Sequence, residues 1–183
     1  MKKIALMFIC ILLMAGCSCS LMNADTPTKK TEEFLDKYKN LDDDVISDLN
    51  DSVDSENLND ENAGIYENVL KRQYQDLKYK VTDEKIDGDE ATTTVNITVY
   101  DLYKVGTDAD EYLTDNPSEF LTNNTYDNNK FMKYKLGKMK DTEKTVDYTI
   151  KVYLSKVDGE WVVQEPEAEV KEKIHGLYNY EDQ

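Results

Sequence analysis

The chain has 183 residues, of which 38 are Asp or Glu and 22 are Lys or Arg, so its formal net charge at pH 7 is −16. A surface this acidic repels phosphate backbones and anionic headgroups, which excludes nucleic acid as a partner and flat docking on anionic lipid. The length suffices for one domain with a real hydrophobic core.

The first element is an apolar run near the N-terminus. Met1-Lys2-Lys3 is followed by residues 4–14, none of which is charged. This run is too short to cross a membrane, which takes roughly 20 residues. A positive start, a short apolar run and small residues are typical of a secretory signal peptide. The run ends in Leu13-Met14-Ala15-Gly16-Cys17.

The order small–small–Cys after this run resembles the lipobox of bacterial lipoproteins. The resemblance implies that residues 1–16 are a signal peptide and that Cys17, as the first mature residue, carries a diacylglycerol on its sulfur. Two or more acyl chains anchor a protein stably, so the resemblance also implies attachment to the outer face of the bacterial cytoplasmic membrane. Residues 17–26 are then a lipidated tether. The alternative is an ordinary signal peptide with an incidental cysteine.

The cysteine count fits this interpretation. The chain has three cysteines, Cys10, Cys17 and Cys19. Cys10 would leave with the signal peptide and Cys17 would be lipidated. Cys19 then has no partner, so we expect a folded domain without a disulfide bond.

Helical periodicity begins after the tether. Thr26-Pro27 is a typical helix start, with Thr as the cap and Pro in the first turn. Asp42, Asp43 and Asp44 suit the N-terminus of a second helix, and a third follows a polar stretch at 54–62. The apolar stripes of the three helices are Phe34, Leu35, Tyr38 and Leu41; Val45, Ile46, Leu49 and Val53; and Ile65, Tyr66, Val69, Leu70 and Tyr74.

Alternation with a period of two then predicts strands at 77–81 and 91–99, joined by a turn at Asp87-Gly88. Apolar residues from Tyr112 to Leu121 and from Phe131 to Met139 predict two inserted helices. A strand at 146–154 turns at Asp158-Gly159 into Trp161, which forms a second hairpin, and Pro166 opens a last helix.

The phrases "KIDGDEATTTVNITV" and "KVDGEWVV" resemble small lipoproteins with the cystatin-like, nuclear-transport-factor-2-like fold. The resemblance covers roughly residues 26–165 and implies that N-terminal helices pack on a curved antiparallel sheet. The order of the predicted elements gives a single α+β domain over residues 27–183, with a sheet of about four strands, a helical insertion between two hairpins and a short C-terminal helix. The inserted helices depart from the simplest pattern of the family.

Candidate chemical residues are few, and we predict no catalytic residue, no metal site and no cofactor. His175 is the only histidine, and near a helix end it is expected to be a surface residue or a dipole partner. Asp101 and Asp147 are expected on strands. Residues 83–88 have the glycine of a calcium loop, but Lys85 occupies a ligand position. Trp161 is expected in the core, with ligand stacking as the alternative.

These patterns predict a non-enzymatic, lipid-anchored extracytoplasmic module that binds an envelope protein or a small ligand, and that is a monomer. The alternative is an enzyme or small-ligand carrier with a pocket between the sheet and the helices. A catalytic pocket should hold at least two buried titratable groups in contact. A third hypothesis, a structural spacer, predicts no pocket.

Overall fold

The computed structural model describes residues 25–181 of the chain. The helices and strands follow in this order: α1 (Pro27–Asn40), α2 (Asp43–Ser55), α3 (Asp60–Gln75), β1 (Lys78–Asp87), β2 (Glu90–Tyr100), α4 (Leu102–Asp115), the 3-10 helix η2 (Pro117–Phe120), β3 (Leu121–Thr122), β4 (Thr125–Tyr126), α5 (Asn128–Asp141), β5 (Thr145–Val157), β6 (Glu160–Val163) and α6 (Ala168–His175). The α+β prediction is therefore confirmed.

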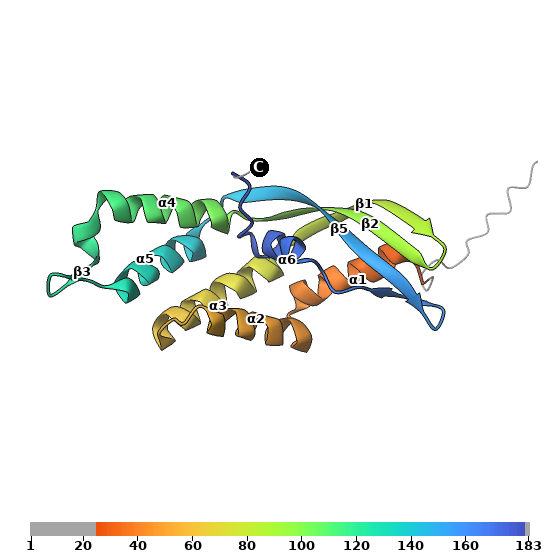
Figure 1. Cartoon of the computed structure of the whole chain (residues 1–183), viewed down its shortest axis with the longest axis horizontal. Helices are drawn as coiled ribbons and strands as arrows, with labels where there is room; N and C mark the ends of the chain where they lie inside the picture. The colour runs from red at the N-terminus through yellow and green to blue at the C-terminus, as the bar shows by residue number, and fades with distance from the viewer. Residues whose placement is uncertain (1–24, 182–183) are drawn as a thin grey trace, which may run out of the picture.

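The main sheet is antiparallel, with strand order β1-β2-β5-β6. Its centre is the pair β2 and β5, whose register runs unbroken from Glu90↔Ser155 to Tyr100↔Thr145. A bulge between Val81 and Asp83 of β1 adds to the bend of the sheet, which is curved in Figure 1. Both hairpins turn where the sequence predicts, and Gly88 and Gly159 have positive φ there.

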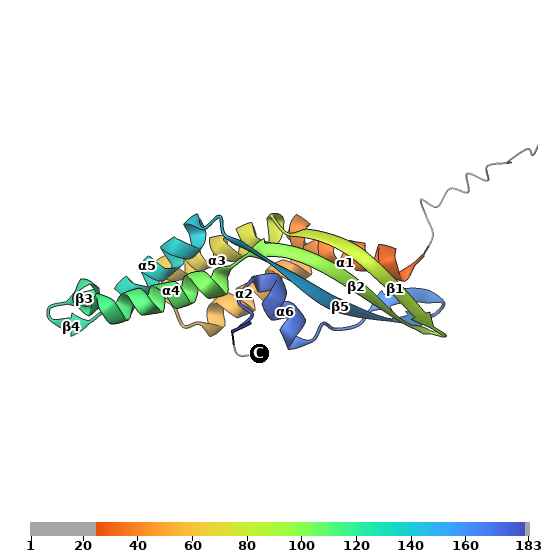
Figure 2. The same cartoon turned by 90° about the horizontal axis from the view of Figure 1, so that it is seen from above.

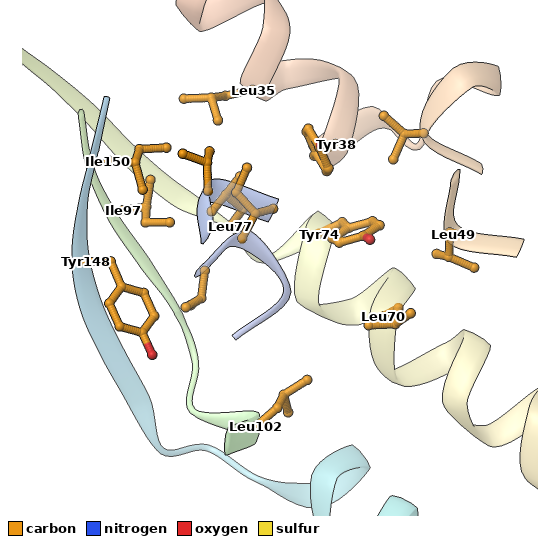
Figure 3. Close-up of a cluster of buried hydrophobic side chains, with 14 of the residues drawn as sticks. Leu35, Tyr38, Leu49, Leu70, Tyr74, Leu77, Ile97, Leu102, Tyr148 and Ile150 are labelled. Atoms are coloured by element: carbon orange, nitrogen blue, oxygen red, sulfur yellow. The ribbon is translucent and has the colours of Figure 1, made fainter. Parts of the chain in front are cut away.

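The helices α1, α2, α3 and α6 gather on one side of the sheet (Figures 1 and 2). Helix α1 lies against the sheet, and α3 packs on α1, α5 and α6. Figure 3 shows the buried side chains between these layers, where the rings of Tyr38 and Tyr74 meet edge to face with centroids 5.2 Å apart. The prediction that N-terminal helices pack on a curved sheet is confirmed.

Helix starts follow from local capping. The Thr26 side chain accepts a hydrogen bond from the Lys29 backbone N–H, and Pro27 opens α1, as predicted. Helix α6 begins at Ala168 rather than at Pro166, because Glu167 is its N-cap. Asp25 belongs to the fold and not only to a tether, since its carboxylate accepts a hydrogen bond of 2.8 Å from the Trp161 backbone N–H.

The helical insertion forms an arm of α4, η2, β3, β4 and α5 that extends along the long axis of the molecule (Figure 1). The first inserted helix begins at Leu102 and not at Tyr112, so the predicted start is wrong. Asp101 follows Tyr100, the last residue of β2, and is the N-cap of α4. Its side chain accepts a hydrogen bond from the Lys104 backbone N–H. Asn123 and Asn124, both with positive φ, make the tight turn between β3 and β4.

Candidate functional site

The candidate site is an apolar pocket of about 300 Å³ at the base of the arm. Its lining comes from the loop after α2, from α3, α4 and α5, and from the segment after α6; none of it comes from a strand. The apolar part of the lining is Leu58, Leu102, Met132, Leu136, Met139 and Leu177. The volume is at the lower end of the range for small-molecule sites.

Helix periodicity builds the walls. Met132, Leu136 and Met139 recur on one face of α5, at the spacing that puts side chains on a common stripe. Gly106 of α4 faces α5 closely: a Cβ at this position would lie 3.2 Å from Met139 Cε and 3.3 Å from Lys135 Cε. The absent side chain therefore lets the two helices approach each other at the pocket.

Arg72, the only arginine of the chain, fixes the end of α5 against α3. Its guanidinium donates hydrogen bonds to the backbone carbonyls of Lys140, at 2.7 Å, and Thr142, at 2.9 Å, and to the Glu143 carboxylate. It also stacks on the Tyr100 ring, 3.9 Å from the centroid. These contacts hold two walls of the pocket in fixed relative positions.

Charged groups surround the pocket. Lys135 Nζ lies 2.9 Å and 3.0 Å from the carboxylate oxygens of Asp110, in an ion pair that is partly exposed. Glu56, the C-cap residue of α2, is an exposed member of the lining. It takes part in no ion pair with the other residues from 25 to 181. The lining therefore carries one negative charge that no nearby cation balances.

Tyr66 of α3 brings its hydroxyl to the pocket. The residue is only 7% exposed, yet its hydroxyl has no hydrogen-bond partner within the described part of the chain. Burial and, to a smaller extent, the charge of Glu56 raise the pKa of Tyr66 to about 12. The hydroxyl therefore stays protonated at neutral pH and can both donate and accept a hydrogen bond.

The structure does not bring Asp101 and Asp147 together. Asp101 is buried as the cap of α4, where it also accepts a hydrogen bond of 3.0 Å from the Tyr180 hydroxyl. Asp147 does lie on a strand, but it is exposed and accepts a hydrogen bond from the Thr98 hydroxyl. Asp101 is not on a strand, which corrects that expectation, and neither carboxylate lines the pocket.

His175 is not the cationic dipole partner or surface residue that its position in the sequence predicts. Its Nε2 lies 2.8 Å from the Tyr74 hydroxyl, and Tyr74 is almost completely buried. Burial and the nearby charge of Lys171 lower the pKa of His175 to about 4. The imidazole is therefore neutral at pH 7, and the pair stands apart from the pocket lining.

Trp161 is 5% exposed and belongs to the core, as predicted. Cys17 and Cys19 lie outside the described residues, so the lipidation site and the tether remain predictions. Within residues 25–181, no group of three His, Cys, Asp or Glu side chains is placed to hold a metal ion. The helices of this same part of the chain are too short or too polar to span a bilayer.

Sequence periodicity predicts some of the pocket residues, but only as core positions. Tyr66, Met132, Leu136 and Met139 lie on predicted helix stripes, whereas Leu102 and Gly106 precede the predicted start of the first inserted helix. The spacing of Leu102, Val105 and Ala109 after a capping Asp is the signal for the observed start of α4. Comparison with known proteins found no matching family model, no matching curated protein and no matching solved structure.

Proposed function

We propose that this chain is a lipid-anchored extracytoplasmic lipoprotein whose single domain binds a small ligand of the cell envelope without catalysing a reaction. The observation that carries the binding role is the apolar pocket with the unpartnered Tyr66 hydroxyl. A pure spacer has no need of such a cavity. The membrane location rests on the LMAGC motif at residues 13–17.

The geometry of the fold fits this anchorage. Asp25 contacts Trp161 of β6, and Thr28 contacts Glu84 of β1, so the start of the fold lies beside the two hairpins. The arm lies at the other end of the long axis (Figure 1). The eight-residue step from Cys17 to Asp25 spans at most about 28 Å. Anchorage at Cys17 would thus keep the hairpin end near the membrane and direct the arm away from it.

The composition of the pocket favours binding over catalysis. The ion pair in its lining, between Lys135 and Asp110, lies on the rim, with Asp110 54% exposed. The buried pair Tyr74–His175 and the pair Tyr180–Asp101 lie outside the lining. General acid–base chemistry needs such groups at the reacting atoms.

Methionine NMR tests the binding role in the full chain, because Met132 and Met139 both line the pocket. We expect n-hexanol, a neutral apolar probe, to shift the ¹³Cε resonances of both residues saturably in protein purified in detergent. Met132→Leu and Met139→Leu assign the two signals. Thr107→Trp, which fills the pocket from a half-buried position on α4, should abolish the shift while the protein stays folded. Signals that do not respond to an apolar probe at any concentration would refute the binding role.

A further inference from the structure

We propose that the pocket at the base of the arm selects an apolar cation: a small molecule with an alkyl or aryl body and an ammonium head. This inference rests on the proposed binding function and names the class of ligand. The walls supply the apolar surface, and the charged groups of the lining, Glu56, Asp110 and Lys135, decide the charge of the ligand.

The charges at the pocket favour a cationic head. Lys135 already pairs with Asp110 through both carboxylate oxygens, so it is compensated within the protein. Glu56 keeps an uncompensated negative charge at the same pocket. An anionic head would be repelled by Glu56, and it would have to displace Asp110 to pair with Lys135. A cationic head finds Glu56 available without breaking a contact that exists.

Tyr66 supplies a second polar contact for the head group, beside Glu56. The Tyr66 hydroxyl has no protein partner within residues 25–181 and is accessible from the pocket, so a ligand there can form a hydrogen bond with it. The Tyr66 hydroxyl is a member of the lining and more than nine-tenths of its residue is buried. An ammonium group has three donors and no acceptor, so one N–H can donate to Tyr66 Oη and another to the Glu56 carboxylate.

The methionine side chains of the lining suit an alkyl or aryl body. Two of the apolar side chains are methionines, whose unbranched thioethers adapt to ligands of different shape. Gly106 lets α4 and α5 approach closely, so that the Met139 side chain lies against α4 at the pocket. The volume of about 300 Å³ limits the occupant to a small molecule.

The experiment compares three probes that share one hexyl chain: n-hexylammonium, n-hexanol and n-hexanoate. Each is titrated into the full chain in detergent at pH 7 while the Met132 and Met139 methyl signals are followed. We expect saturable shifts with n-hexylammonium at an affinity about tenfold higher than that of n-hexanoate.

Variants identify the groups that select the cation. Tyr66→Phe should weaken n-hexylammonium binding about tenfold, whereas Tyr38→Phe, equally buried in α1 but outside the pocket, should leave it unchanged. Glu56→Gln should weaken it about threefold, because Glu56 is exposed to solvent. Glu90→Gln, on the sheet, is the matched control for a lost negative charge.

The outcomes separate the two proposals. If n-hexanol or n-hexanoate binds as tightly as n-hexylammonium, the pocket is a binding site but the cation inference is wrong. If Tyr66→Phe and Tyr38→Phe behave alike, Tyr66 does not contact the ligand and the inference is also wrong. If no probe shifts the two methyl signals, the inference and the proposed binding function fail together.

Discussion

Replacing Gly176 by alanine should destabilise the protein far more than a normal glycine substitution. Gly176 ends α6 with φ +71°, in the left-handed region. A Cβ here would lie 2.2 Å from the Tyr100 carbonyl oxygen and 2.3 Å from Gln73 Nε2. The Gln73 amide is fully buried, donates a 3.1 Å hydrogen bond to this same carbonyl, and accepts a 3.0 Å bond from the Tyr100 N–H.

The magnitude follows from two contributions. The left-handed conformation costs an alanine roughly 1–2 kcal/mol. Because both neighbouring atoms belong to the buried Gln73–Tyr100 contact, at least one of its hydrogen bonds must break, which costs about 1–3 kcal/mol per unsatisfied group. We therefore expect Gly176→Ala to lower the free energy of unfolding by about 4 kcal/mol, against a total of about 5–15 kcal/mol for a domain. The shift would also displace Leu177, which lines the pocket.

Gly88→Ala is the matched control. Gly88 has φ +63°, but a Cβ there meets no atom within 4 Å. It should therefore show the conformational cost alone, about 1–2 kcal/mol. Urea unfolding followed by the fluorescence of Trp161, the only tryptophan, measures both variants. Equal losses in the two variants would show that the contact with Gln73 and Tyr100 does not matter, and the reasoning would be wrong.

Three further predictions use other parts of the chain. Folding lowers the pKa of His175 from 6.5 to about 4, so the unfolded chain binds a proton at this residue more readily than the folded chain. The free energy of unfolding should therefore fall by about 2 kcal/mol as the pH drops from 6.5 to 4. Urea unfolding of His175→Gln at several pH values should lack this contribution to the pH dependence of stability. Trp161→Ala should cost roughly 3–5 kcal/mol and Trp161→Phe much less, as measured by thermal unfolding, while a freely iodide-quenched native fluorescence would contradict the core position. Cys17→Ser should stop incorporation of radiolabelled palmitate and leave uncleaved precursor on a gel; wild-type labelling of the variant would disprove the anchor.

The fold was largely predictable because its sequence patterns are local and agree with one another. The alternation around Val95 and Ile150 predicts β2 and β5, and the Asp-Gly pairs predict both hairpin turns. The start of α4 is hard to predict because β2 runs directly into its cap: Tyr100 is the last strand residue and Leu102 the first helical one. With no loop between them, composition marks no boundary, and the signal that remains is a capping Asp101 followed by helical spacing.

The candidate site was less predictable than the fold because its residues come from five separate segments. Tyr66 and Leu136 look like ordinary core positions when each helix is considered alone. What distinguishes Tyr66 is the lack of a partner for its hydroxyl, and that depends on which neighbours α4, α5 and the segment after α6 bring to it. His175 illustrates the same limit, since its neutral state follows from burial beside Tyr74, 101 residues earlier in the chain. Periodicity identifies which side chains are buried, but the groups that remain unpaired emerge only from the packing of distant segments, and the proposed ligand selection rests on these groups.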